Sequence, residues 1–289
     1  MSHAPVFILT APRSGSTLLR VMLAGHPDLF APPELRLVEF KTMQEREVSL
    51  GPCNFGGCSK HTCDQRHGLQ RALMELNQLD ENASRCIIEE MLERDETTLH
   101  AYQMLMEQAA PRRLVDKSPS YAAKLETLQR SNQLFPDAQY IYLHRHPGAV
   151  IESILRNGFE SSSAKAEATW TSRNSNIQEF LSTLEPAQQI RVPYEELVAD
   201  PEAVLRGICW FLGIEFNTNV LNPYDGARMT DGIQSGTLPP GDWNFMNHSR
   251  ISRDRAEAWR NSGLQFSFLE KTAQIAEVLD YEMNATAAA

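Results

Sequence analysis

The sequence predicts an α/β protein in which a parallel sheet is flanked by helices. Short apolar or β-branched runs alternate along the chain with longer segments of helical periodicity. No internal repeat or low-complexity tract interrupts this alternation. At 289 residues the chain is long for one domain, but a single α/β core with insertions reaches this length. We therefore expect one domain over residues 1–283, followed by a linker or tail remnant over 284–289.

The expected elements follow from these runs. The first strand is the apolar segment 5–10, and the other expected strands are 113–116, 139–144 and 189–192. The expected helices are 17–25, 34–47, 68–77, 82–93, 97–109, 119–131, 147–157, 163–183, 200–212 and 267–279.

The segment 50–68 shows neither the periodicity of a helix nor that of a strand, and it is rich in Gly and Cys. A loop of this length inside a compact domain is usually functional, so we predict a lid over the site. A zinc site is the alternative. However, Cys53, Cys58, Cys63 and His67 have the spacing C-x₄-C-x₄-C-x₃-H, which is not a common zinc pattern. We prefer a lid with free thiols and expect no metal.

Charge and composition limit the partners. The formal net charge is −10, which disfavours bulk attraction to nucleic acid or to an anionic membrane. No window is long and apolar enough for a membrane helix. The cysteines number five, an odd count, and the N-terminus carries no export signal, so we expect a reduced, cytoplasmic protein. An anionic ligand would have to be held by a local cluster of donors.

One such cluster follows the first strand, in Ala11-Pro-Arg-Ser-Gly-Ser-Thr17. A strand, a turn of small residues and a helix together aim backbone N–H groups and the positive helix end at a phosphate. Gly15 allows close approach of the backbone, Ser16 and Thr17 can cap the helix and donate, and Arg13 supplies fixed positive charge. The loop lacks G-x-x-x-x-G-K-[ST], so an ATP-dependent kinase or other nucleotide-binding regulator is disfavoured.

A second cluster lies at the end of the strand 139–144. Arg145 ends this strand, and Pro147 is well placed for the first turn of the next helix. Ser153 lies two turns into that helix. Its hydroxyl would share an anion with Arg145 if the strand end curls over the helix face.

Three motifs together resemble the sulfotransferases that use 3′-phosphoadenosine-5′-phosphosulfate (PAPS). Pro12-Arg-Ser-Gly-Ser-Thr17 resembles their 5′-phosphosulfate loop, and Arg145 with Ser153 resembles their 3′-phosphate motif. Val192-Pro-Tyr-Glu-Glu-Leu-Val-Ala-Asp-Pro201 is similar to their R-Y-E-D-L-x-x-D-P segment. The resemblance implies a P-loop-NTPase-like sulfotransferase fold, with PAPS as donor and 3′-phosphoadenosine-5′-phosphate (PAP) as product.

The resemblance also implies residue roles. The 5′-phosphosulfate would be held by Arg13, Ser14, Gly15, Ser16 and Thr17, and the 3′-phosphate by Arg145 and Ser153. Tyr194 would lie near the adenine, or it would be a packing residue at the strand end. Pro193 replaces the donor that the family usually carries, which leaves the adenine-side contacts less defined.

The reacting end needs charge stabilisation on the leaving phosphate and a base for the acceptor hydroxyl. Lys117 follows a predicted strand and matches a lysine that some sulfotransferases place at the bridging oxygen. Two residues compete for the base. Glu34 resembles the catalytic glutamate of tyrosylprotein sulfotransferases. His248 ends a segment resembling a G-D-x-N-F-x-x-H signature, and we place it ahead because histidine titrates near working pH.

The resemblance extends to sulfotransferase domains of polyketide synthases of the curacin and olefin-synthase type. It rests on the blocks Pro32-Pro-Glu-Leu-Arg36 and Gly241-Asp-Trp-Asn-Phe245 and on the Cys/Gly-rich segment. It implies an acceptor β-hydroxyl on an acyl chain carried by an acyl carrier protein. A thioesterase would then act to leave a terminal alkene. The alternative is a free-standing sulfotransferase for a carbohydrate or small-molecule hydroxyl.

Overall fold

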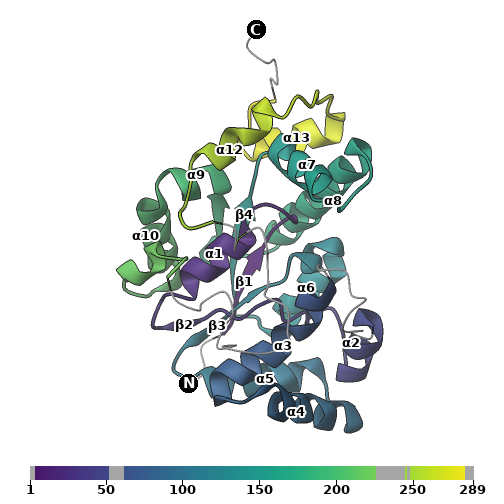
Figure 1. The fold of residues 1–289 in the computed structure, drawn as a ribbon, viewed down its shortest axis with the longest axis vertical. Coiled ribbons are helices and arrows are strands. Elements are labelled where there is room, and N and C mark those ends of the chain that lie inside the picture. The colour runs from purple at the N-terminus through teal and green to yellow at the C-terminus, as the bar shows by residue number, and fades with distance from the viewer. Residues whose placement is uncertain (1–3, 52–61, 226–244, 246–247, 284–289) are drawn as a thin grey trace.

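The structure is a computed structural model and describes residues 4–51, 62–225, 245 and 248–283. Within these residues, the strands form one parallel five-stranded sheet in the order β2-β3-β1-β4-β5 (Figure 1). The predicted α/β class with a parallel sheet is therefore confirmed. The strands are β1 (Val6–Leu9), β2 (Leu29–Phe30), β3 (Arg113–Lys117), β4 (Gln139–His144) and β5 (Gln189–Pro193).

The central strand β1 pairs with both β3 and β4. Val6 is in register with Val115 on one side and with Gln139 on the other. Because all three strands run parallel, their carboxyl ends meet at one edge of the sheet, where α/β proteins hold their ligands. The residues that follow these strands are therefore brought together although they are far apart in the sequence.

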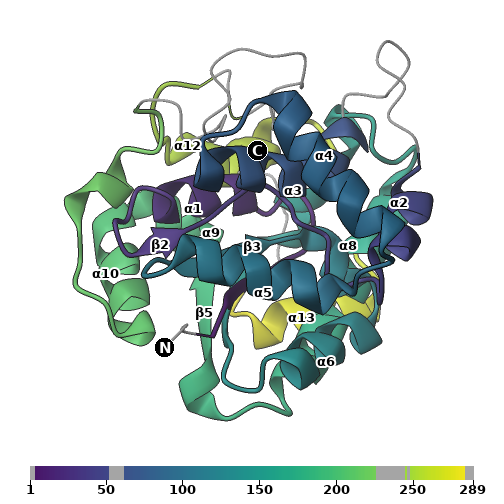
Figure 2. The ribbon, with the colours of Figure 1, turned by 90° about the horizontal axis from the view of Figure 1, so that it is seen from below.

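Helices cover both faces of the sheet. Figure 2 shows α10 on one side, with α6 and α13 away from it on the other. The helices are α1 (Ser16–Leu23), α2 (Met43–Leu50), α3 (Thr62–Asn77), α4 (Glu81–Glu93), α5 (Thr98–Ala109), α6 (Leu125–Leu134), α7 (Pro147–Arg156), α8 (Ser163–Leu181), α9 (Tyr194–Ala199), α10 (Pro201–Leu212), α12 (Asp254–Glu257) and α13 (Glu270–Val278), with the short turns η1 (Pro119–Ala123), η2 (Pro186–Gln188), η3 (Thr218–Leu221) and η4 (Ala258–Asn261).

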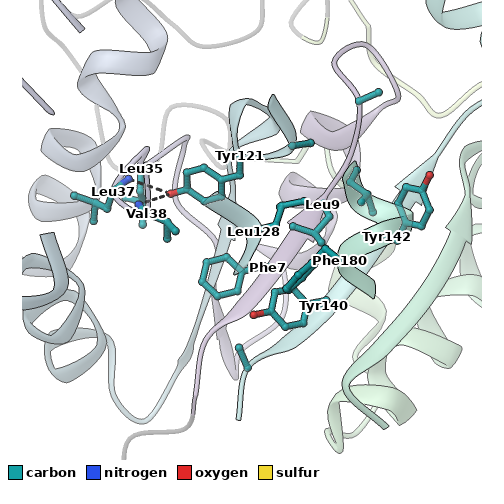
Figure 3. Close-up of a cluster of buried hydrophobic side chains, with 14 of the residues drawn as sticks. Phe7, Leu9, Leu35, Leu37, Val38, Tyr121, Leu128, Tyr140, Tyr142 and Phe180 are labelled. Carbon is teal, nitrogen blue, oxygen red and sulfur yellow. Dashed lines mark hydrogen bonds between the residues drawn. The ribbon is translucent and has the colours of Figure 1, made fainter. Parts of the chain in front are cut away.

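The alternation of side chains along β1 divides the core in two. Val6 and Ile8 pack into the cluster under α1, α9 and α10. Phe7 and Leu9 pack into the larger cluster with α3, α5, α6, α7 and α8. In that cluster the ring of Phe7 stacks on Tyr140, with centroids 5.5 Å apart (Figure 3). Burial on both faces explains why these strands read as continuous apolar runs.

One predicted helix, 34–47, is wrong in its first half. Helix α2 begins only at Met43, where the Thr42 side chain accepts from the Glu45 amide. Arg36 has a positive φ of 51°, which a right-handed helix does not allow. The predicted helix 119–131 is also divided, into η1 and α6. The strand β2 and the helix α9 were not expected from the sequence.

The predicted lid over 50–68 is wrong at its carboxyl end, because α3 begins at Thr62. Residues 52–61 lie outside the described residues, and so do Cys53 and Cys58 of the zinc alternative and the tail 284–289. His67 is buried in α3, where its Nδ1 lies 3.2 Å from Gln70 Oε1. Among the helices that the structure describes, none is long and apolar enough to cross a membrane.

Candidate active site

The turn between β1 and α1 has the geometry of a close-approach loop. Gly15, which caps α1, has φ 91°, and Arg13 has φ 67°. A Cβ on Gly15 would lie 2.3 Å from the ring of Tyr194, so no larger residue fits without displacing that ring. Glycine is therefore required here by both conformation and space. The amino end of α1, with Ser16 and Thr17 as its first residues, points out of this turn.

Arg145 follows β4 and connects this turn to two other segments. Its Nη1 donates to the Arg13 carbonyl (3.2 Å) and its Nη2 to the Arg255 carbonyl (2.6 Å). Its guanidinium carbon lies 4.3 Å from the ring centroid of Tyr194, a cation–π contact. Its own carbonyl accepts from Trp170 Nε1 at 3.0 Å. The side chain is thereby held beside the phosphate loop that the sequence predicts.

Ser153 completes this group from α7. Arg13 Nε donates to Ser153 Oγ at 3.2 Å, so the two predicted phosphate motifs are in direct contact. The sequence predicted that Ser153 shares an anion with Arg145, whereas the side-chain contact in the structure joins Ser153 to Arg13. We refer to Arg13–Thr17, Arg145, Ser153 and Tyr194 together as the nucleotide region.

Two polar atoms of the nucleotide region are buried without a hydrogen-bond partner among the residues that the structure describes. They are Ser14 Oγ and Arg145 Nε. Buried polar groups are nearly always hydrogen-bonded, because an unmet donor costs about 1–3 kcal/mol. Hydroxyl and guanidinium donors at the amino end of a helix suit the oxygens of a phosphate or sulfate. These residues therefore fit an anionic ligand.

The second group, which we call the reacting region, consists of Glu34 and Lys117. Lys117 is the last residue of β3, which extends one residue beyond the predicted strand 113–116. Its Nζ lies 2.7 Å from Glu34 Oε1, and the two side chains are 5% and 14% exposed. Glu34 lies in an irregular segment, and Gly68 of α3 packs so closely on its carbonyl that a Cβ would lie 1.9 Å from that oxygen.

His248, the other candidate base, lies on the side of Arg255. Its Nε2 contacts the Arg255 guanidinium, and its amide donates to the Phe245 carbonyl at 3.1 Å. Because Arg255 also holds Arg145 through its carbonyl, His248 is connected to the nucleotide region. The residues 241–244 and 246–247 of its predicted signature lie outside the described residues. The described contacts thus join Glu34 to Lys117 and His248 to Arg255.

A buried polar network that was not predicted from the sequence flanks Arg145. The His146 amide donates to Glu195 Oε1 (3.0 Å), and Tyr281 Oη donates to Glu195 Oε2 (2.8 Å). Tyr281 Oη also lies 2.9 Å from His144 Nδ1. Burial is the main cause that lowers the pKa of His144 and of His146 to about 4. Both histidines appear beside Arg145 in the sequence, but Glu195 and Tyr281 carry no local signal that connects them.

Comparison with known proteins agrees with this geometry. A family model described as "Sulfotransferase family" matches residues 5–218. The sulfotransferase domain from the curacin biosynthetic pathway is 42% identical, with a TM-score of 0.87 and coverage of 97% of this chain and 98% of that one. The sulfotransferase domain from the Synechococcus PCC 7002 olefin synthase is also 42% identical, with a TM-score of 0.88 and coverage of 98% and 96%.

Among curated proteins, the nodulation protein NoeE of Sinorhizobium fredii (strain NBRC 101917 / NGR234) is 32% identical over 282 residues, which cover 88% of this chain. This chain spans 59% of the length of NoeE. It spans 69% of the "Putative protein-tyrosine sulfotransferase" of Caenorhabditis briggsae and 52% of protein-tyrosine sulfotransferase A of Caenorhabditis elegans. The family match shows a transferase of the sulfotransferase class. With the family model matching most of its length, the chain belongs to the sulfotransferase family.

Proposed function

We propose that this protein transfers a sulfuryl group from PAPS to the β-hydroxyl of an acyl chain on an acyl carrier protein. Sulfation would convert a poor leaving group into a good one. A downstream thioesterase would then hydrolyse the thioester, and decarboxylation with loss of sulfate would leave a terminal alkene. The observation that carries the choice of acceptor is the 42% identity, over nearly the whole chain, to the curacin and olefin synthase sulfotransferase domains.

The nucleotide region supports PAPS as donor. The Ser14 and Arg145 atoms that lack partners among the described residues match a ligand with two anionic groups. Arg13, Ser14, Gly15, Ser16 and Thr17 would hold the 5′-phosphosulfate. Arg145 and Ser153 would hold the 3′-phosphate, which ATP lacks, and Tyr194 would border the adenine. Tyr194 also has a structural role, since its ring packs on Gly15.

The reacting region supports a direct displacement. The acceptor oxygen would form a bond to sulfur while the bond between sulfur and the bridging phosphate oxygen breaks. Glu34 would take the hydroxyl proton, and Lys117 would stabilise the charge that develops on the departing PAP. The pairing of Glu34 with Lys117 at 2.7 Å favours Glu34 over His248 as the base, because base and leaving-group lysine then act on the same sulfur.

The donor is tested by thermal melts with PAP, AMP and Mg-ATP. A ligand at about a hundred times its Kd that binds only the folded state stabilises it by roughly 2.7 kcal/mol. We expect selective stabilisation by PAP. A response to Mg-ATP without one to PAP would mean that Arg145 and Ser153 do not form a 3′-phosphate site.

The acceptor is tested by mass spectrometry of a β-hydroxyacyl carrier protein after incubation with PAPS. We expect the mass of one sulfuryl group to be added to the acyl chain. If the carrier substrate stays unmodified while a sugar or a free small alcohol is sulfated, the protein is instead a free-standing sulfotransferase for such hydroxyls.

A further inference from the structure

A single buried carboxylate, that of Asp116, anchors the segment that carries Glu34. Asp116 precedes Lys117 on β3 and is 1% exposed. Its Oδ2 accepts from Tyr121 Oη at 2.7 Å, and its Oδ1 accepts from Ser118 Oγ at 2.8 Å. Tyr102 also donates to Oδ2. Three hydroxyl groups from one region of the chain thus converge on one carboxylate at the end of β3.

Two of these hydroxyls reach on to the backbone of the segment 36–38. Tyr121 Oη accepts from the amides of Leu37 (3.0 Å) and Val38 (3.3 Å), as Figure 3 shows. Ser118 Oγ accepts from the amide of Arg36 at 3.2 Å. In the interior of a helix, consecutive amides donate to carbonyls of the preceding turn. Here the amides of residues 36–38 donate instead to the side chains of Ser118 and Tyr121.

We propose that Tyr121 and Ser118 are positioning residues, which act through Asp116 to fix Glu34 relative to Lys117. This inference rests on the proposed function, because it assigns Glu34 and Lys117 to sulfuryl transfer. The physical reason is that Lys117 and Asp116 are neighbours on one rigid strand. The hydrogen bonds that run from Asp116 through Tyr121 and Ser118 to the 36–38 backbone therefore set the distance between the strand end and Glu34, and small displacements of reacting groups have large rate effects.

Other contacts hold the same segment from outside. Arg46 of α2 donates twice to the Leu35 carbonyl, at 3.2 and 3.0 Å. Arg20 of α1 donates to the Ala31 carbonyl at 2.9 Å. The donors of these contacts lie on α1 and α2 rather than at the end of β3. They retain the segment in the fold, whereas Tyr121 and Ser118 connect it to the strand that carries Lys117.

The chain offers a matched control. Tyr102 and Tyr121 are both buried and both donate to Oδ2 of Asp116, but among the contacts described here only Tyr121 accepts from the 36–38 amides. The variants Tyr121→Phe and Tyr102→Phe each remove one hydroxyl from the same carboxylate oxygen. We expect Tyr121→Phe to lower kcat about tenfold or more while the Kd for PAP stays unchanged. Tyr102→Phe should leave kcat within about twofold of the parent.

Ser118→Ala serves as a second variant in case Tyr121→Phe folds poorly, and it should lower kcat in the same direction. Amide hydrogen exchange of the peptide spanning 36–38 gives a readout that needs no acceptor. Exchange should accelerate in Tyr121→Phe and Ser118→Ala but not in Tyr102→Phe. Equal kcat and equal exchange in the two tyrosine variants would overturn the inference. Absence of sulfuryl transfer by the parent protein would instead contradict the proposed function, and the exchange result would still decide the anchor.

Discussion

The two regions of the site differ in how their buried polar groups are satisfied. In the nucleotide region, Ser14 and Arg145 keep buried polar atoms without partners among the described residues. In the reacting region, Glu34 and Lys117 satisfy each other at 2.7 Å. Arginine stays charged and presents its donors in a rigid fork, which suits a site that binds an anion. In the proposed reaction Lys117 and Glu34 act on the same sulfuryl group, and in the structure they form an ion pair.

This difference predicts the largest effect for loss of the base. Glu34→Gln should lower kcat by about 10²–10⁴-fold, because it removes the proton acceptor while keeping the shape. His248→Gln should instead act mainly on PAP affinity or KM, since His248 contacts Arg255 beside the nucleotide region. Steady-state kinetics of both variants measure this. If His248→Gln loses kcat and Glu34→Gln does not, the base belongs to the other side of the site.

A smaller effect is expected in the nucleotide region. Arg145→Met should raise the Kd for PAP by about 10–100-fold, because hydrogen bonds to a charged group contribute about 1.5–3 kcal/mol. Arg156→Met is the matched control, since Arg156 ends α7 with its side chain 64% exposed beside Glu152. Isothermal titration with PAP measures both. An equal loss in the control would show that long-range charge, rather than a built 3′-phosphate site, governs binding.

The close approach of the phosphate loop is tested next. Gly15→Ala should lower the free energy of unfolding by about 1–3 kcal/mol and weaken PAP binding, because the new Cβ meets the Tyr194 ring. Gly213→Ala shares a positive φ, of 72°, but its Cβ would meet open space. Urea unfolding of both separates backbone strain from the Tyr194 contact. Equal losses would mean that the contact adds nothing.

A further effect concerns acid stability next to Arg145. His144 and His146 have pKa values of about 4 in the folded state against an ordinary 6.5. Between these pH values the unfolded chain binds more protons, so the free energy of unfolding falls as pH drops from 6.5 toward 4. Each histidine contributes a slope of up to about 1.4 kcal/mol per pH unit.

Buried carboxyls act in the opposite sense at the low end of this range. Burial raises the pKa of Glu195 and of Asp116, so these groups take up protons in the folded state first and offset part of the loss. Urea unfolding between pH 4 and 7 should therefore show a shallower slope in His146→Gln than in the parent protein. An unchanged slope would mean that His146 does not titrate differently on unfolding.

Much of the nucleotide region was predictable because its signals are local. The loop 11–17 and the start of α7 each join a buried strand to a helix through a few residues, and the structure confirms both junctions. The contact between Arg13 and Ser153 was not predictable in the same way, because it joins residues 140 positions apart. It depends on β1 and β4 being neighbours in the sheet.

The error over 34–47 has the opposite origin. The apolar residues Leu35 and Val38 have a spacing that is compatible with a helix, and the sequence argument followed it. In the structure, Tyr121 and Ser118 take the amides of this segment, and both belong to a part of the chain more than eighty residues away. Local periodicity cannot reveal that a distant hydroxyl competes for a backbone amide.

The sequence by itself determined the strand-to-helix junctions, the arginines and small residues within them, and the position of Lys117 at a strand end. These follow from short-range periodicity and turn chemistry, which act within a few residues. The tertiary structure alone decided that Glu34 pairs with Lys117 and that Ser118 and Tyr121 hold the amides of the segment 36–38. It did so because the order of parallel strands, and with it the meeting of their carboxyl ends, depends on packing over the whole chain.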